Sequence, residues 1–114
     1  MTDLNVLFYL KKTKTNKAGE APIYLRITVN GQRAEMSTGR STITKSWDRG
    51  SHRLKGKSEK SRILNNFLDE LENKLNRVYN IALQEEKQIS AEDLKDVLSG
   101  KDKNKKMLIP IFDE

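Results

Sequence analysis

Hydrophobic and polar positions alternate with a period of two along residues 21–38, as expected for strands with one buried face. The alternation stops once, at Asn30-Gly31, a pair that favours a type I′ turn because both of its central residues need positive φ. The sequence therefore predicts a hairpin of two strands, over residues 21–29 and 32–38, with the sheet ending at Gly39.

The turn also predicts the register of this hairpin, with Thr28 opposite Arg33, Arg26 opposite Glu35 and Leu25 opposite Met36. Side chains of a strand point alternately to its two faces, so one face is hydrophobic throughout and the other is polar. The hydrophobic face consists of Ile23, Leu25, Ile27, Ala34 and Met36. The polar face consists of Tyr24, Arg26, Thr28, Arg33, Glu35 and Ser37.

A further strand is predicted over residues 4–10, "LNVLFYL", with Val6, Phe8 and Leu10 on one face and Leu7 and Tyr9 on the other. The next ten residues, "KKTKTNKAGE", are polar and include four lysines. This segment is long for a hairpin connection, and we interpret it as a mobile basic flap.

The segment after Gly39 mixes basic residues with glycines and is harder to assign. Thr44 precedes "KSWD" and is a candidate cap for a single helical turn. Such a turn would place Ile43 and Trp47 under the sheet, with Trp47 filling the core.

From Ser58 to about Gln88 the hydrophobic period becomes helical, and Ser58 is a candidate N-cap. The helix would be about 45 Å long, whereas a seven-residue strand spans only about 23 Å, so its second half must find another partner. Its hydrophobic stripe is Leu64, Leu68, Leu71, Leu75, Val78 and Ala82, with Ile63, Phe67 and Tyr79 beside it.

A second, shorter helix is predicted to provide that partner. Ser90 and Asp93 have the spacing of a capping box, and Gly100 is a C-terminal stop signal. Leu94, Val97 and Leu98 form its hydrophobic stripe. The predicted fold is therefore α+β: a three-stranded antiparallel sheet backed by a long helix, with a helical hairpin extension.

These elements divide the chain into three segments. Residues 1–57 contain the sheet and a basic connector, and residues 58–100 contain the two helices that pack on the sheet. Residues 101–114 combine a lysine-rich linker composition with the hydrophobic run "MLIPIF", and we interpret them as a linker and the truncated start of a following domain.

The charge is concentrated in the first half of the chain. Of the formal net charge of +6, residues 1–57 carry twelve Lys or Arg against four acidic residues, a net +8, while residues 58–114 carry ten against twelve, a net −2. A basic patch of this kind favours an acidic partner such as a nucleic acid.

Several other chemistries lack the residues that they require. The 114 residues include no cysteine and one histidine, His52, so neither a thiolate zinc site nor a catalytic constellation is expected. The acidic residues Asp69, Glu70 and Glu72 are interpreted as a solvated helix face. The first residues lack the pattern of a signal peptide, and we expect a soluble cytoplasmic protein of a bacterium, without cofactor, metal, membrane or small-molecule substrate.

The polar face of the hairpin is the strongest candidate for a binding surface. An exposed polar sheet face is common, and Arg26 with Glu35 could be an ordinary cross-strand pair. Here, however, the face also carries Arg33 and Tyr24, the four-lysine flap joins the same sheet, and a second basic run follows it. This combination suits a DNA major groove, where strands contact bases and cations contact phosphates. The residues that we expect to contact DNA are Lys11, Lys12, Lys14, Lys17, Tyr24, Arg26, Thr28, Arg33, Glu35, Ser37, Arg49, Arg53, Lys55 and Lys57.

The stretch "FYLKKTKTNKAGEAPIYLRITVNGQRAEMSTG", followed by "SWD" and the helix "LNNFLDELENKL", resembles a known family. It is similar to the N-terminal arm-type DNA-binding region of tyrosine recombinases, in particular integrases of Bacteroides-type phages and conjugative transposons. The resemblance covers roughly residues 5–100.

The resemblance implies a three-stranded sheet, backed by a helix, that lies in the major groove of arm sites distant from the crossover. In that family a core-binding domain and a catalytic domain with an Arg/Lys/His/Arg set and a tyrosine nucleophile follow. This chain has neither that set nor a matching tyrosine motif, so we interpret it as a non-catalytic DNA-binding region, nucleoid-associated when bound.

Two other functions fit the same elements. A sheet with a helix behind it also resembles double-stranded RNA-binding modules, which recognise shape and 2′-hydroxyls. Alternatively, the helical hairpin binds another recombinase subunit and the basic sheet is incidental. Both functions can coexist, with DNA on the sheet and protein on the helices.

Overall fold

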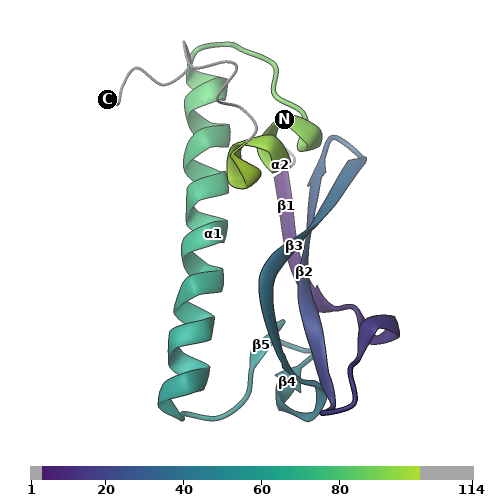
Figure 1. Ribbon diagram of the computed structural model, residues 1–114. Helices are drawn as coiled ribbons and strands as arrows, with labels where there is room; N and C mark the ends of the chain where they lie inside the picture. The colour runs from purple at the N-terminus through teal and green to yellow at the C-terminus, as the bar shows by residue number, and fades with distance from the viewer. Residues whose placement is uncertain (1–3, 101–114) are drawn as a thin grey trace.

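The computed structural model describes residues 4–100. Figure 1 shows one layer of strands with the long helix lying along it. The elements, in chain order, are β1 (Leu4–Leu10), the 3₁₀ turn η1 (Lys12–Lys14), β2 (Glu20–Val29), β3 (Gln32–Ile43), the 3₁₀ turn η2 (Thr44–Ser46), β4 (Trp47–Asp48), β5 (Arg53–Leu54), α1 (Glu59–Gln84) and α2 (Ala91–Ser99). The predicted linker and start of a following domain, residues 101–114, lie outside the described residues.

The predicted hairpin and its register are confirmed. β2 and β3 pair antiparallel, with Thr28 opposite Arg33 and Arg26 opposite Glu35. Asn30 and Gly31 have φ of 51° and 86°, as a type I′ turn requires. β1 pairs antiparallel with the other side of β2, so the order β1-β2-β3 places β2 in the centre.

The prediction that Gly39 ends the sheet is wrong. β3 continues to Ile43 and pairs again with the start of β2, after a bulge opposite Ile23. Gly39 has a φ of 81° inside the bulge, and the Thr38 hydroxyl donates to the Ile23 carbonyl at 2.8 Å. Glycine here allows the strand to bend rather than stop.

The expected placement of Ile43 is wrong for the same reason. Because pairing resumes beyond the bulge, the period of two places Thr42 inward opposite Ala21 and turns Ile43 outward, where it is 36% exposed. The predicted single turn forms as a 3₁₀ turn, but the prediction that Thr44 caps it is wrong: Thr44 is its first residue, and Ile43 is the N-cap, without a side-chain cap hydrogen bond. Trp47 is buried in the core as expected.

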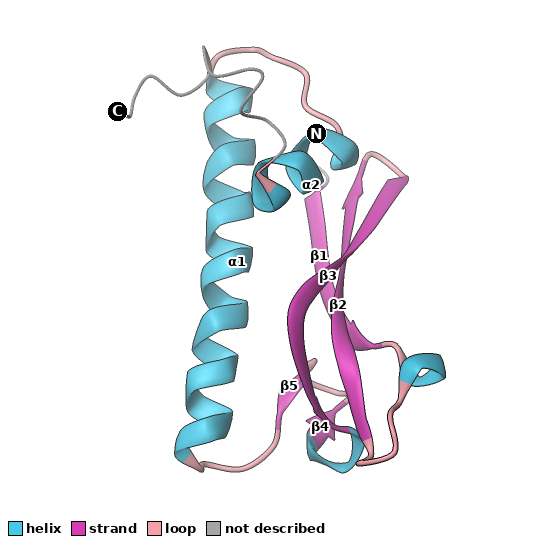
Figure 2. Cartoon of the chain, in the orientation of Figure 1, coloured by secondary structure: helices cyan, strands magenta, loops and turns pink. Residues whose placement is uncertain are grey.

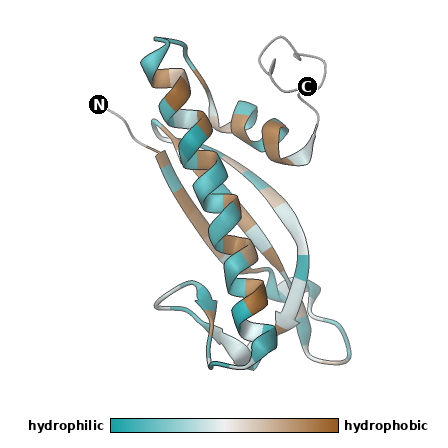
Figure 3. Ribbon diagram, turned by 90° about the vertical axis from the view of Figure 1, so that its left-hand side faces the viewer, coloured by the Kyte–Doolittle hydropathy of each residue, from teal (hydrophilic) through white to brown (hydrophobic). Residues whose placement is uncertain are grey.

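The long helix begins at the predicted cap, where the Ser58 side chain accepts from the Ser61 backbone N–H. It ends at Gln84 rather than Gln88, because Glu86 takes a positive φ of 57°. Along the helix, hydrophobic and hydrophilic segments alternate as an amphipathic element requires (Figure 3). Ile63 differs from the expectation, since it is 58% exposed while its stripe neighbours Leu64 and Leu68 are buried.

The second helix forms with the predicted capping box, Ser90 with Asp93, and ends at Gly100 in the left-handed region. It contacts β2 and β3 as well as α1, so α2 packs against both the long helix and the sheet (Figure 2). Leu94 is fully buried there. The second half of α1 is thus covered by α2.

Among residues 4–100, neither helix is both long and apolar enough to cross a membrane.

Candidate nucleic-acid interface

The outward side of the three-stranded sheet is a grid of three rows. It consists of the six polar-face residues of the hairpin and the three outward residues of β1, and we call all nine the polar face. Because β2 is central, its outward residues Tyr24, Arg26 and Thr28 each have a partner on both neighbouring strands. The rows are Asn5-Thr28-Arg33, Leu7-Arg26-Glu35 and Tyr9-Tyr24-Ser37. α1 covers the opposite side of the sheet (Figure 1), so this grid is not packed against the helix layer.

The middle row is held together by charge. The Arg26 Nε lies 2.8 Å from Glu35 Oε2, and the Arg26 guanidinium lies 5.1 Å from the centre of the Tyr9 ring. The hydrogen bond from Arg26 is the main cause that lowers the pKa of Glu35, while burial and then Glu35 raise the pKa of Tyr9. In the middle row, the charges of Arg26 and Glu35 are therefore paired with each other within the face.

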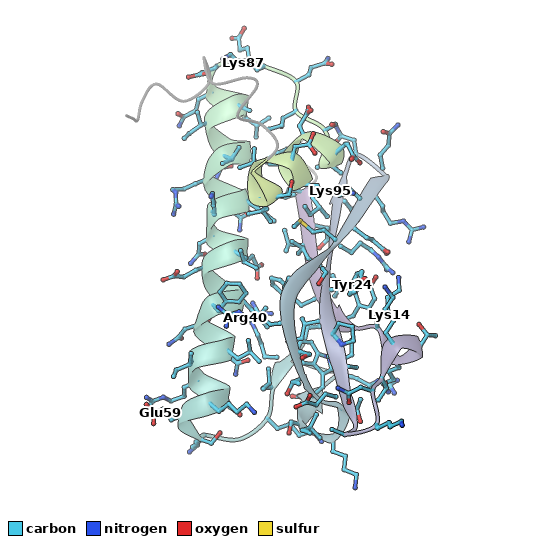
Figure 4. All side chains as sticks on the ribbon, viewed as in Figure 1. Lys14, Tyr24, Arg40, Glu59, Lys87 and Lys95 are labelled. Atoms are coloured by element: carbon cyan, nitrogen blue, oxygen red, sulfur yellow. The ribbon has the colours of Figure 1, made fainter. Side chains whose placement is uncertain are left out.

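The row nearest the flap has lysines over an aromatic ring. The Lys14 ammonium lies 3.1 Å from the Tyr24 hydroxyl oxygen (Figure 4), and the Lys11 ammonium lies 4.7 Å from the ring centre. The Tyr9 and Tyr24 ring centres are 6.1 Å apart. Cations over a ring face are attracted to it, so this arrangement holds two lysines at the margin of the polar face.

The flap, residues 11–20, contains more internal hydrogen bonds than its composition suggests. The Asn16 side-chain oxygen accepts from the backbone N–H groups of Ala18 and Glu20, both at 2.9 Å. The backbone N–H of Thr44 donates to the Gly19 carbonyl, which ties the flap to the end of β3. Lys12 and Lys17 are exposed. Mobility of the flap stays a prediction.

The row nearest the turn is different, because its arginine is free. Arg33 is exposed, and within residues 4–100 its side chain has neither an ion pair nor a hydrogen bond. Its strand neighbours in the row, Thr28 and Asn5, are small polar residues. Arg33 is thus the arginine of the polar face that is available to an external acceptor.

The cations of the second basic segment, residues 49–57, differ in their surroundings: Arg53 is paired with acidic residues, and the other three are exposed. Arg53 pairs with Asp69 and Glu72 of α1, each at 2.9 Å, and lies 4.9 Å from the centre of the Phe8 ring on the core side of the sheet. This geometry favours a structural role for Arg53, although its DNA contact stays a prediction. It also shows that Asp69 and Glu72 are ion-pair partners rather than only a solvated face. Arg49, Lys55 and Lys57 are exposed.

Sequence reasoning left three residues of the grid out of the expected DNA contacts: Asn5, Leu7 and Tyr9 of β1. The signal was present, because the alternation of residues 4–10 already separates Leu7 and Tyr9 from the core side. What was missing was the order of the strands, since only pairing of β1 with β2 brings Tyr9 beside Arg26 and Tyr24.

A family model described as "Arm DNA-binding domain" matches residues 8–95 of this chain. The match covers the flap, β2, β3, the small β4–β5 sheet, all of α1 and the first half of α2. No curated protein and no solved structure matches the chain.

Proposed function

Because the chain belongs to the arm DNA-binding domain family, the arm-type DNA-binding domains of phage integrases, we propose that its polar face reads the sequence of double-stranded DNA. A domain of this family binds DNA and is itself non-catalytic. The finer proposal is that the DNA is an arm-type site of a mobile element, bound by the non-catalytic region of a tyrosine recombinase during DNA integration.

The observation that carries this proposal is Arg33, an exposed arginine of the polar face whose side chain has no ion pair or hydrogen bond within residues 4–100. A major groove admits a strand pair, and an arginine beside it contacts the O6 and N7 acceptors of guanine with two hydrogen bonds. Arg26 is already bonded to Glu35, which leaves Arg33 as the main candidate for base reading. Thr28 and Asn5, in the same row, add side chains that hydrogen-bond to bases.

The lysines at the other margin suit a different role. Lys11 and Lys14 lie over Tyr24, at the edge of the grid rather than at its centre. Cations that flank a groove-binding element contact phosphates, which positions a protein but carries no sequence information. The polar face thus supplies base contacts near the turn and phosphate contacts near the flap.

Double-stranded RNA is less compatible with this geometry. The major groove of A-form RNA is deep and narrow, and side chains cannot read it. An arginine presented beside the turn of a strand pair suits the wider major groove of DNA. We therefore expect weaker binding to an RNA duplex of the same sequence.

The test uses a duplex enriched from a random-sequence library by the wild-type chain, compared with an unselected duplex of equal length. Arg33→Ala should lose about 1–3 kcal/mol of binding free energy on the enriched duplex and much less on the unselected one, since a base contact is lost. Fluorescence anisotropy at fixed salt measures both dissociation constants.

Two comparisons make the test specific. Arg77→Ala removes the same charge from an exposed position of α1, in the layer behind the sheet, and should leave both constants nearly unchanged. Neutralising Lys11, Lys14 and Lys17 together should weaken binding to both duplexes equally. Equal losses of Arg33→Ala on the two duplexes would mean that the polar face does not read sequence.

A further inference from the structure

A hollow of about 620 Å³ lies where the flap meets the small β4–β5 sheet. It is lined by Tyr9 of the polar face, Lys12 of the flap, and Trp47, Arg49 and His52 of the segment that connects and flanks β4 and β5. Because Tyr9 belongs to both, the hollow continues directly from the polar face. Segments that are far apart in sequence therefore contribute to one concave surface.

The charge of this hollow is one-sided. Lys12 and Arg49 contribute two positive charges, and no acidic side chain lines it. Within the described chain neither cation has an ion pair or a side-chain hydrogen bond, and both are exposed. Two unpaired cations from different elements on one concave surface favour an anionic ligand.

Asp48, the last residue of β4, directs its carboxylate into the turn that joins β4 to β5. Asp48 Oδ1 accepts from the Gly50 N–H at 3.1 Å, and Oδ2 accepts from the Ser51 hydroxyl at 3.0 Å. The Gly50 hydrogen bond is the main cause that lowers the pKa of Asp48. The carboxylate therefore shapes the turn that carries Arg49.

This turn is firmly attached to the rest of the fold. Asn65 of α1 accepts from the Leu54 N–H at 2.9 Å and donates to the Leu54 carbonyl at 3.2 Å. Arg53 adds its ion pairs to α1, and Trp47 is buried in the core. A cation on such a rigid support loses less conformational entropy on binding than one on a free loop.

We infer that this hollow is a phosphate-binding site, in which Lys12 and Arg49 contact one phosphodiester of the DNA strand that leaves the polar face. The inference rests on the proposed function, because it names the DNA phosphate as the anion and the small β4–β5 sheet as a second DNA-contacting element. It also separates the basic segment into Arg49, which faces the ligand, and Arg53, which holds the support.

The test measures binding of Lys12→Gln, Arg49→Gln and the double variant to an unselected 20-base-pair duplex across a series of salt concentrations. Each single variant should reduce the slope of log affinity against log salt by about 1. The corresponding loss of affinity is about fivefold at 0.15 M salt, since one phosphate contact contributes a slope of about −0.9. Lys74→Gln and Arg77→Gln, at exposed positions of α1, are the charge-matched controls and should change neither value.

The double variant tests whether the two cations share a phosphate. Two side chains on one phosphate are coupled. The loss of affinity in the double variant should therefore differ from the product of the two single-variant losses by at least about twofold. Losses that simply multiply, or single losses no larger than those of the controls, would overturn the inference. The ratio of enriched to unselected binding should be unchanged in these variants, whereas Arg33→Ala changes it, so the two proposals can fail separately.

Discussion

The two faces of the same three strands differ in almost every physical respect. On the core face, Ile23, Leu25 and Ile27 are fully buried beneath the helices. On the polar face, Arg26 and Glu35 are about one-third exposed, and Arg33 is exposed without a partner. Because successive residues of a strand alternate between faces, a single register assigns one set of positions to the core and the other set to the exposed face proposed to bind DNA.

This separation has a consequence for mutagenesis. Core-face substitutions should change the free energy of unfolding without altering the contacts of folded molecules with DNA. Polar-face substitutions should change the proposed DNA contacts and lower the free energy of unfolding by no more than about 1 kcal/mol. The turn joins the two sets, since it determines the register on which the separation depends.

The largest effect is expected from Leu25→Ala on the core face. Leu25 is fully buried on the central strand, so truncation removes buried apolar surface and leaves a cavity. The free energy of unfolding should fall by about 2–5 kcal/mol, measured by urea denaturation. Thr28→Ala, on the opposite face of the same strand, should cost no more than about 1 kcal/mol. Similar losses for the two variants would break the comparison between the faces.

An intermediate effect is expected at the turn. Gly31 has a φ of 86°, a region that costs an L-residue with a Cβ roughly 1–2 kcal/mol. Gly31→Ala should therefore lower the free energy of unfolding by about that amount. An added Cβ would meet no atom within 4 Å there, so the cost would be conformational rather than steric.

Gly50→Ala is the matched control for the turn. Gly50 lacks a positive φ, and its added Cβ would lie in ordinary contact, 3.6 Å from Asp48 Oδ1. Its effect on thermal stability should stay within about 0.5 kcal/mol. Equal destabilisation by both substitutions would show that the left-handed turn does not hold the register.

The smallest effect is expected from Glu35→Gln on the polar face. The Arg26–Glu35 pair is partly exposed, and such pairs contribute up to about 1 kcal/mol. Because the pKa of Glu35 is lowered in the folded protein, mainly by the Arg26 hydrogen bond, its contribution is present above the unfolded pKa of about 4.3. It is lost as the pH falls through the folded pKa.

Denaturation measured between about pH 6 and about pH 2 checks this expectation. The stability difference between wild type and Glu35→Gln should be largest near pH 6 and should disappear at the acid end. A difference independent of pH would indicate that the carboxylate charge contributes nothing. Such a result would also weaken the view that Glu35 fixes Arg26 and leaves Arg33 as the reader.

Local sequence signals predicted much of this protein because they act over only a few residues. Asn30-Gly31 determined the turn, and the turn determined the register and both faces of the hairpin. Ser58 and the box of Ser90 with Asp93 marked the beginnings of the helices. In each case the deciding interaction joins residues that are at most a few positions apart.

The errors arose where the deciding partner is distant in sequence. Gly39 is a strong stop signal by itself, but pairing of residues 41–43 with the start of β2 carries the strand past it and turns Ile43 outward. Arg53 belongs to a basic run, yet Asp69 and Glu72, sixteen and nineteen residues later, bind its guanidinium. A pattern of residue types along the chain does not show which distant residues will come into contact.

The sequence by itself therefore determined the hairpin, its register, the two helices and the concentration of charge in the first half. Tertiary structure alone decided which cations are free. It placed Tyr9 beside the Arg26–Glu35 pair that the register predicted, placed Arg53 against α1 and brought Lys12 and Arg49 to one hollow. The physical reason is that alternation and capping are local, whereas the availability of a charge depends on every group that the fold brings within a few ångströms of it.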